Sequence, residues 1–320
     1  MKTVFLNAAK LDFDHKLDFS PLSRLTTLTN YDSSSNEEII ARVQDQTIVI
    51  TKEMPVSREI ILQFPPSVKL ICEAGTGYNN IDIAAACEKN IAVCNIPSYS
   101  TEAVAQLAIT FILNLSASLP QQQSMLERKN FGNFTSYLQV PHFELRGKTL
   151  GIIGAGAIGH QVAKFALALG MNILVYNPRP KTWSEANVRF TNLEELLAES
   201  DFISLHCPLT ADTRHLINKE RLQLMKPTAY IVNTSRGPLI HEADLIAALR
   251  NKKIAGAGLD VQDPEPPALD NPLFEMDNVI MTPHIGWRRY ETRQRLVNLI
   301  ADNIQAFLAG TPVNIVNSKA

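Results

Sequence analysis

The chain has 320 residues, of which 45% are hydrophobic and 19% charged, and 30 Lys and Arg against 32 Asp and Glu give a net charge of −2. This length suits about two domains. The composition excludes a disordered chain, because disorder requires low hydrophobicity and high net charge. It also excludes a nucleic-acid binder that depends on bulk positive charge. No run of about 18 apolar residues predicts a transmembrane helix, and the apolar start is too short for a signal peptide.

The cysteines lack the close spacing of a zinc site or a redox motif. They are Cys72, Cys87, Cys94 and Cys207. Most lie in apolar runs, which favours reduced thiols packed as small hydrophobic side chains over disulfides. We therefore expect a soluble cytoplasmic protein that holds no metal and binds neither nucleic acid nor membrane.

Short β-branched runs alternate with helical stretches, which is the pattern of a parallel α/β sheet. Before residue 100, strands are predicted near 2–7, 26–29, 47–51, 69–72 and 91–94. Helices are predicted near 36–44, 57–63 and 82–88. Asp82 is expected to cap the third of these helices. A long amphipathic helix follows at about 100–119, and Pro120 is expected to stop it.

A second α/β series begins at Gly147. Its strands are predicted at 149–153, 172–176, 202–205, 229–233, 256–260 and 279–282, and its crossover helices at 157–169, 193–199, 219–224 and 242–250. Six strands in this alternation match a complete doubly wound sheet. A final helix at about 292–308 lies beyond the sixth strand and is expected to pack on the first domain. The predicted domains are therefore 1–99 with 287–320, and 100–286.

The motif Gly154-Ala155-Gly156-Ala157-Ile158-Gly159 lies between a predicted strand and an amphipathic helix. In this context a G-x-G-x-x-G sequence is a strong signal for a dinucleotide site. Gly154 permits the tight turn, Gly156 lets the backbone approach a pyrophosphate, and Gly159 lets the helix pack closely on the strand. The helix N-terminus offers free N–H groups and a partial positive charge to the phosphates.

Asn177 directly follows the strand after this helix, at the place where NAD-binding sites carry an acid for the ribose hydroxyls. Asn177 is neutral, and Arg179 and Lys181 follow it. An acid would repel a 2′-phosphate, whereas Arg or Lys would pair with it. We therefore hypothesise that NADP(H) is accepted or preferred. The alternative is that Asn177 binds the ribose of NAD(H) while both cations face solvent.

Arg236, Glu265 and His284 follow the fourth, fifth and sixth strands of the second series. Ligands of open α/β sheets bind at this edge, and the three residues suit hydride transfer to a 2-keto acid. Arg236 could hold the substrate carboxylate and the C2 oxygen, His284 could exchange the proton, and Glu265 would favour the imidazolium. Each alone has a simpler interpretation as a surface or backbone-bonded residue. Together, beside a dinucleotide motif, they favour catalysis.

These motifs resemble the D-isomer-specific 2-hydroxyacid dehydrogenases, which include glycerate, phosphoglycerate, lactate and formate dehydrogenases and the glyoxylate/hydroxypyruvate reductases. The similarity runs from about Leu70 to Leu296. Besides the glycine loop it rests on residues 75–82, 204–210, 233–237, 260–261, 264–266 and 283–284.

The resemblance implies an α/β fold of two Rossmann-like domains, each a doubly wound parallel sheet, with the active site in the interdomain cleft. It implies a flavodoxin-like substrate domain and a homodimer built largely on the dinucleotide domain. It assigns catalysis to Arg236, Glu265 and His284. The implied cofactor contacts are Thr76, Ala157, Ile158, Asn177, Cys207, Thr234, Asp260 and His284. Backbone N–H groups of Ala74, Gly75, Thr76 and Gly77 would hold the substrate carboxylate.

Two departures from the family bear on the substrate. Glu73 stands where members that act on phosphorylated glycerate often carry Arg, and a carboxylate would repel a phosphate. Trp287 stands where small residues are usual. Either this indole walls the substrate pocket and favours a small side chain, or it packs at the domain hinge.

We therefore predict an NAD(P)H-dependent reductase of small, unphosphorylated 2-keto acids. Hydroxypyruvate and glyoxylate are the first substrates, and branched or aromatic 2-keto acids the second. One alternative is a phosphoglycerate dehydrogenase-like enzyme. Another is a dinucleotide-sensing, corepressor-like binding protein, which the fold alone does not exclude but which has no need of an intact catalytic trio. A glycine-loop methyltransferase ranks last for the same reason.

Overall fold

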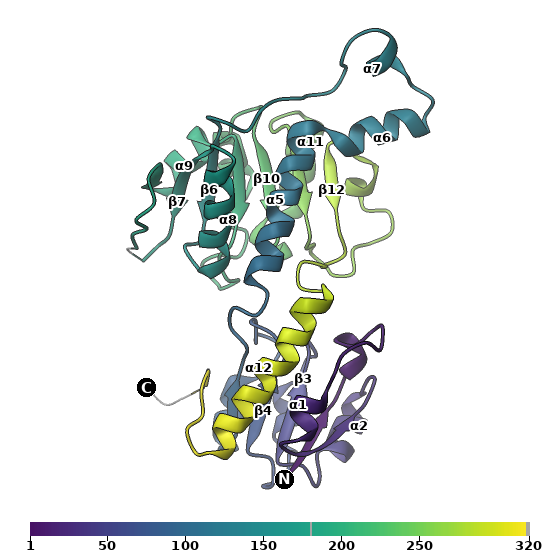
Figure 1. The fold of residues 1–320 in the computed structure, drawn as a ribbon, viewed down its shortest axis with the longest axis vertical. Coiled ribbons are helices and arrows are strands. Elements are labelled where there is room, and N and C mark those ends of the chain that lie inside the picture. The colour runs from purple at the N-terminus through teal and green to yellow at the C-terminus, as the bar shows by residue number, and fades with distance from the viewer. Residues whose placement is uncertain (180, 318–320) are drawn as a thin grey trace. The chain divides into compact units, whose positions relative to one another are not determined.

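The computed structural model describes residues 1–179 and 181–317, and the chain forms two compact units. The first unit joins Met1–Ser100 to Trp287–Ala320, and the second comprises Thr101–Gly286 (Figure 1). Among the described residues no single helix is long and apolar enough to cross a membrane. One pair of described helices, Thr101–Ala117 and Leu119–Glu127, reaches that length and composition together but is bent by 59°.

The first unit is built on a five-stranded parallel sheet of order β2-β1-β3-β4-β5. The strands are β1 (Lys2–Phe5), β2 (Thr27–Asn30), β3 (Ile48–Thr51), β4 (Leu70–Glu73) and β5 (Ala92–Cys94). The helices are η1 (Ala8–Lys10), α1 (Ser20–Ser23), α2 (Asn36–Arg42), α3 (Arg58–Ile61), α4 (Ile83–Glu88) and α12 (Tyr290–Leu308). This strand order is flavodoxin-like, and it reverses between β1 and β3, where such folds bind their ligands.

Local sequence explains where these helices begin. Ser35 and Glu38 form a capping box at the start of α2. Asp82 accepts a hydrogen bond from the Ala85 N–H and caps α4, as predicted. One face of the sheet packs against α12, whose buried Leu296 and Ile300 join a core shared with the strands.

The second unit is built on a seven-stranded parallel sheet of order β12-β11-β10-β9-β6-β7-β8. The strands are β6 (Thr149–Ile153), β7 (Asn172–Tyr176), β8 (Val188–Phe190), β9 (Phe202–Leu205), β10 (Tyr230–Asn233), β11 (Gly256–Leu259) and β12 (Val279–Met281). Six of them match the predicted strands within a residue, and the edge strand β8 is additional. The α/β fold and its doubly wound parallel sheets are therefore confirmed.

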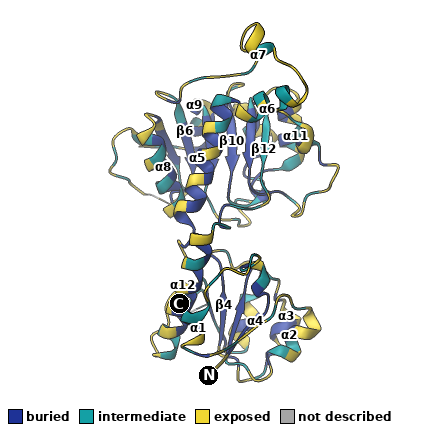
Figure 2. Ribbon diagram, turned by 45° about the vertical axis from the view of Figure 1, so that its right-hand side comes forward, coloured by how far each residue is buried: buried dark blue, intermediate teal, exposed yellow. Residues whose placement is uncertain are grey.

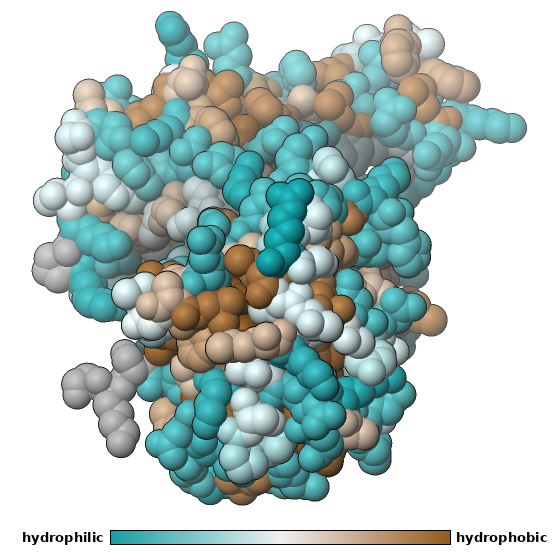
Figure 3. Space-filling view, turned by 60° about the horizontal axis from the view of Figure 1, so that its bottom comes forward, coloured by the Kyte–Doolittle hydropathy of each residue, from teal (hydrophilic) through white to brown (hydrophobic). Residues whose placement is uncertain are grey.

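Helices cover both faces of this second sheet. The helices of this unit are α5 (Thr101–Ala117), α6 (Leu119–Glu127), α7 (Gly132–Thr135), α8 (Ala157–Ala168), α9 (Leu193–Glu199), α10 (Lys219–Leu224), η2 (Gly237–Leu239), α11 (Glu242–Arg250) and η3 (Pro272–Glu275). Helices α5 and α8 share one core with the strands, and α9, α10 and α11 share the other (Figure 1). Figure 2 shows the central strands of both sheets in dark blue, as buried, whereas α7 contains no buried residue and is coloured yellow and teal. On the face shown in Figure 3, hydrophobic side chains gather in patches among hydrophilic ones.

The prediction that Pro120 stops the long helix is wrong. Helix α5 ends at Ala117, and Ser118 turns the chain with a left-handed φ of 49°. Pro120 then lies in the first turn of α6, where its missing N–H has no intrahelical partner to lose.

Candidate active site

Three neighbouring strands of the second unit end in register at one edge of the sheet. Asn233 at the end of β10 pairs with Leu259 at the end of β11, which pairs with Met281 at the end of β12. The loops after these strands carry Arg236, Glu265 and His284. The parallel register therefore brings the predicted trio to the same edge of the sheet.

Glu265 and His284 form a direct pair, with 3.0 Å between Glu265 Oε2 and His284 Nδ1. The other carboxylate oxygen of Glu265 accepts a hydrogen bond from the Gln262 N–H at 3.0 Å. Burial raises the pKa of Glu265, but the hydrogen bond and charge of His284, together with the Gln262 N–H and the charge of Arg236, outweigh burial and hold that pKa below its ordinary value. Because a carboxylate only accepts, Nδ1 donates to Glu265. Glu265 therefore contacts Nδ1, and the Nε2 atom is available to exchange a proton with another group.

Asp260 braces the segment that carries His284. It is 1% exposed; one oxygen accepts from Thr282 Oγ1 and from the Ile285 N–H, and the other from the Gly286 N–H. Burial raises the pKa of Asp260 against the effect of these three bonds. The family resemblance implies a cofactor contact for Asp260, whereas its hydrogen bonds to residues 282–286 follow from the structure and not from the motif.

The turn of Arg236 packs directly against the loop of Glu265. Buried Asn233 holds this turn, accepting from the Ser235 N–H and donating to the Arg236 carbonyl at 2.8 Å. A Cβ atom at Gly237 would lie only 1.9 Å from the Gln262 carbonyl oxygen. Only glycine therefore allows the two backbones to approach as they do.

The glycine loop between β6 and α8 has the backbone that a pyrophosphate site requires. Gly154 has a φ of 108°, and a Cβ atom there would lie 2.6 Å from the His206 backbone. A Cβ atom at Gly159 would lie 2.3 Å from the Gly154 carbonyl oxygen. At Gly156, by contrast, nothing lies within 4 Å of such an atom. Ala157 and Ile158 then open α8 with N–H groups free for an anion.

The residues that follow β7 fold back onto the glycine loop. Asn177 Oδ1 accepts a hydrogen bond from the Ala155 N–H at 3.1 Å, and its amide nitrogen donates to the Arg179 carbonyl. Lys181 Nζ donates to the Ala155 carbonyl at 2.9 Å. Lys181 thus lies beside the glycine loop, and both Lys181 and Arg179 are exposed.

Other predicted cofactor contacts lie at the adjoining strand ends. Thr234 follows β10, and its buried hydroxyl has no hydrogen-bond partner among the described residues. Cys207 follows β9, and burial raises the pKa of its thiol to about 11. The neighbouring His206 contacts Ser204 Oγ at 2.8 Å, and burial lowers the pKa of His206 to about 3. His206 is therefore neutral near pH 7 and unsuited to donate a proton there.

The remaining predicted residues belong to the first unit. The turn of Ala74, Gly75, Thr76 and Gly77 follows β4, and Thr76 Oγ1 donates to the Ile96 carbonyl at 3.0 Å. Glu73 is buried, and its carboxylate accepts from Thr51, Asn80 and the Glu53 N–H. Trp287 is 4% exposed, so most of its indole packs inside this unit.

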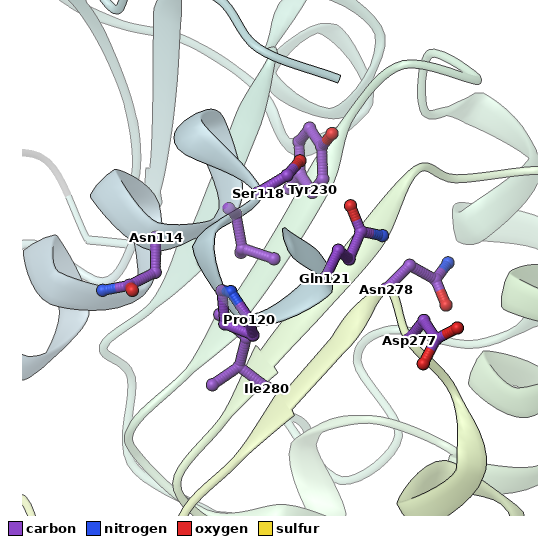
Figure 4. Close-up of a pocket in the computed structure, with 9 residues that line it drawn as sticks. Asn114, Ser118, Pro120, Gln121, Tyr230, Asp277, Asn278 and Ile280 are labelled. Atoms are coloured by element: carbon purple, nitrogen blue, oxygen red, sulfur yellow. The ribbon is translucent and has the colours of Figure 1, made fainter. Parts of the chain in front are cut away.

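The pocket drawn in Figure 4 lies away from the trio. It is formed where α5 bends into α6, and its lining includes Tyr230 at the start of β10 and Asn278 just before β12. These positions mark the amino ends of the strands, whereas the trio follows the carboxyl ends. The candidate active site is therefore the carboxyl edge of the sheet.

Comparisons with known proteins agree with this chemistry. A family model described as "D-isomer specific 2-hydroxyacid dehydrogenase, NAD binding domain" matches residues 109–286. The hydroxypyruvate reductase of Blautia hydrogenotrophica is 40% identical over 99% of this chain and 100% of its own. The structure of an acyclic imino acid reductase (Bsp5) with NADPH and D-Arg has a TM-score of 0.88 at 29% identity, covering 99% of this chain and 100% of that one. The D-lactate dehydrogenase of Aquifex aeolicus with NAD and lactic acid has a TM-score of 0.86 at 30% identity, with the same coverage.

Proposed function

Because the chain belongs to the D-isomer specific 2-hydroxyacid dehydrogenases, we propose that it reduces small, unphosphorylated 2-keto acids, hydroxypyruvate and glyoxylate foremost. The family and its members make it an NAD(P)-dependent oxidoreductase acting on 2-hydroxy and 2-keto acids. The observation that carries the proposal is the 3.0 Å pair of Glu265 and His284 at the edge shared with Arg236. The 40% identity to a hydroxypyruvate reductase supports the choice of substrate.

The roles follow from the chemistry of each group. Arg236 binds the substrate carboxylate and the C2 oxygen through its planar guanidinium, and the N–H groups of the 74–77 turn bind the same carboxylate. His284 Nε2 gives a proton to the C2 oxygen, and Glu265 keeps Nδ1 protonated and stabilises the imidazolium. The nicotinamide cofactor supplies the hydride to C2 when it is bound.

A crossed activity screen tests this function. We expect hydroxypyruvate or glyoxylate to give a kcat/KM at least about tenfold above that of 4-methyl-2-oxopentanoate or phenylpyruvate, since added bulk is discriminated to about that extent. We expect 3-phosphohydroxypyruvate to be a poor substrate. The measurement is initial rate against substrate concentration with NADH and with NADPH. Failure of every 2-keto acid with both cofactors would contradict the proposed function.

We further propose that NADPH is accepted and preferred over NADH. The strand β7 ends without a carboxylate, and the Lys181 ammonium lies 2.9 Å from the Ala155 carbonyl of the glycine loop. Arg179 is exposed nearby and free to meet a phosphate. Both cations suit a 2′-phosphate, which an acid at Asn177 would repel.

Lys181→Ala is expected to lower kcat/KM for NADPH by about tenfold or more and to change kcat/KM for NADH little, because a charge-assisted hydrogen bond to phosphate is lost. The measurement is the ratio of the two kcat/KM values. Lys164→Ala, which removes an exposed lysine from α8, is the control that keeps the ratio. A tenfold preference of the unmodified enzyme for NADH would refute the cofactor proposal.

We also propose a homodimer formed through the segment that contains α7. Phe131, Phe134, Tyr137 and Leu138 are 54%, 75%, 74% and 47% exposed. Clustered exposed apolar groups mark association surfaces, and a second copy offers the same surface in a two-fold arrangement. Phe134→Asp combined with Tyr137→Asp is expected to shift the mass measured by light scattering from dimer to monomer. Phe274→Asp, a change at an exposed phenylalanine of η3, is the control that leaves the mass unchanged.

A further inference from the structure

A fully buried lysine lies at the carboxyl edge of the first sheet. Lys52 follows β3 directly, next to the point where the strand order reverses between β1 and β3. Its side chain is 0% exposed, which is rare for lysine unless it is paired. None of the roles proposed above uses this ammonium group, although the edge where it lies is where such sheets bind ligands.

Contacts hold both the backbone and the ammonium group of Lys52. Asn7 receives a hydrogen bond from the Lys52 N–H at 2.9 Å and donates to the Lys52 carbonyl at 2.7 Å. The ammonium nitrogen Nζ lies 2.6 Å from Glu53 Oε1. The same atom lies 3.9 Å from the centroid of the Trp287 ring, a close cation–π distance. The position of the charge is therefore fixed by contacts on two sides.

This charge lies behind the turn assigned to the substrate carboxylate. A Cβ atom at Gly75 would lie 3.4 Å from Lys52 Nζ and 3.2 Å from Glu73 Oε1. The ammonium and that carboxylate thus meet at the same peptide of the 74–77 turn. Any side chain at residue 75 would contact both charged groups.

Two carboxylates beside this turn oppose the binding of an anion. Burial raises the pKa of Glu73, whereas hydrogen bonds from Asn80, Thr51 and the Glu53 N–H, and the charge of Lys52, favour its ionised form. Glu53 is the second carboxylate; its Oε1 pairs with Lys52 at 2.6 Å, and its Oε2 lies 3.8 Å from the more exposed Lys10 Nζ. A single uncompensated charge at about 6 Å from an anion, at an effective dielectric constant of about 20, weakens binding by about 100-fold.

We propose that Lys52 is a positioning residue whose single positive charge offsets part of the negative charge of Glu53 and Glu73 and so lets the 74–77 turn bind the anionic substrate. This inference rests on the proposed function, which assigns the substrate carboxylate to that turn. Trp287 contributes to the same role, because its ring contacts the Lys52 ammonium and holds it in place next to Gly75. The indole thereby influences substrate binding through Lys52.

Lys52→Met is expected to raise KM for hydroxypyruvate, and the Kd of oxalate measured by calorimetry on the NADPH-saturated enzyme, by about 10- to 100-fold while kcat stays within about threefold. Lys69→Met removes an exposed lysine just before β4 and is the control that changes neither. The oxalate titration does not depend on turnover. An unmodified enzyme that binds oxalate but reduces no 2-keto acid would refute the proposed function. In that case the effect of Lys52→Met on the oxalate Kd would still test the proposed role of Lys52 in anion binding.

A second substitution that restores the charge balance distinguishes an electrostatic role of Lys52 from a role in packing. In Lys52→Met/Glu73→Gln, removal of the opposing charge is expected to return the oxalate Kd to within about threefold of the unmodified value. A role in packing alone predicts no such recovery. Glu73→Gln by itself, with Lys52 intact, is expected to tighten oxalate binding and serves if Lys52→Met does not fold. An unchanged Kd in Lys52→Met, a raised Kd that Glu73→Gln fails to correct, or weaker oxalate binding by Glu73→Gln alone overturns the inference.

Discussion

Replacement of His284 by alanine is expected to lower kcat by about two to four orders of magnitude, the usual contribution of a positioned general acid. The reason is geometric: His284 Nδ1 is held by Glu265 at 3.0 Å, which orients the ring, and Nε2 is the nitrogen that we propose exchanges the proton. The neutral His206, whose pKa burial lowers to about 3, does not substitute for it. The measurement is kcat at saturating 2-keto acid and cofactor.

Two further variants sharpen this test. His142→Ala removes an exposed histidine of the same unit and should leave kcat unchanged. Glu265→Gln keeps a hydrogen-bond partner for Nδ1 but loses the negative charge, so we expect a smaller loss of about tenfold or more. A kcat near the unmodified value in His284→Ala would remove His284 from the role of general acid.

The sheets were predictable because strands and helices alternate with distinct hydrophobic periods. The edge strand β8 was not, since it spans only Val188–Phe190 and has a charged arginine at its centre. Nor was α6, because a proline in the first turn of a new helix reads the same as one that ends the previous helix. Both differences arise where short-range sequence signals are ambiguous and tertiary packing decides.

Some features of the candidate site were likewise predictable from the sequence, and others were not. Strand ends and motif spacing predict which residues reach the carboxyl edge, because parallel register aligns those ends. They do not predict how Asp260 braces residues 282–286, since that carboxylate also matches a cofactor contact. The burial of Lys52 was equally hidden, because it depends on Trp287, which returns to the first unit after the whole second unit has been built. Contacts between such distant residues follow from the topology and leave no local signal.

Gly237→Ala is expected to lower kcat/KM by about 100-fold, although the change adds a single methyl group to a residue that bears no functional side chain. Its Cβ atom would lie 1.9 Å from the Gln262 carbonyl oxygen and 2.1 Å from the Gln262 carbonyl carbon. Both are backbone atoms, so no rotation of a side chain relieves the overlap. The two loops must separate, which moves Arg236 away from Glu265, and a displacement of about 1 Å in an active site costs about this much.

The measurement is kcat/KM for hydroxypyruvate, accompanied by the melting temperature. Pro238→Ala changes the next residue of η2 without adding an atom toward Gln262, so kcat/KM should stay within about threefold. If Gly237→Ala loses activity but keeps a cofactor Kd close to that of the unmodified enzyme, the damage is confined to the Arg236 turn. The reason is that the glycine loop follows β6, whereas Gly237 follows β10. A Gly237→Ala enzyme of normal kcat/KM would instead mean that Arg236 and Glu265 need not be held at a fixed separation.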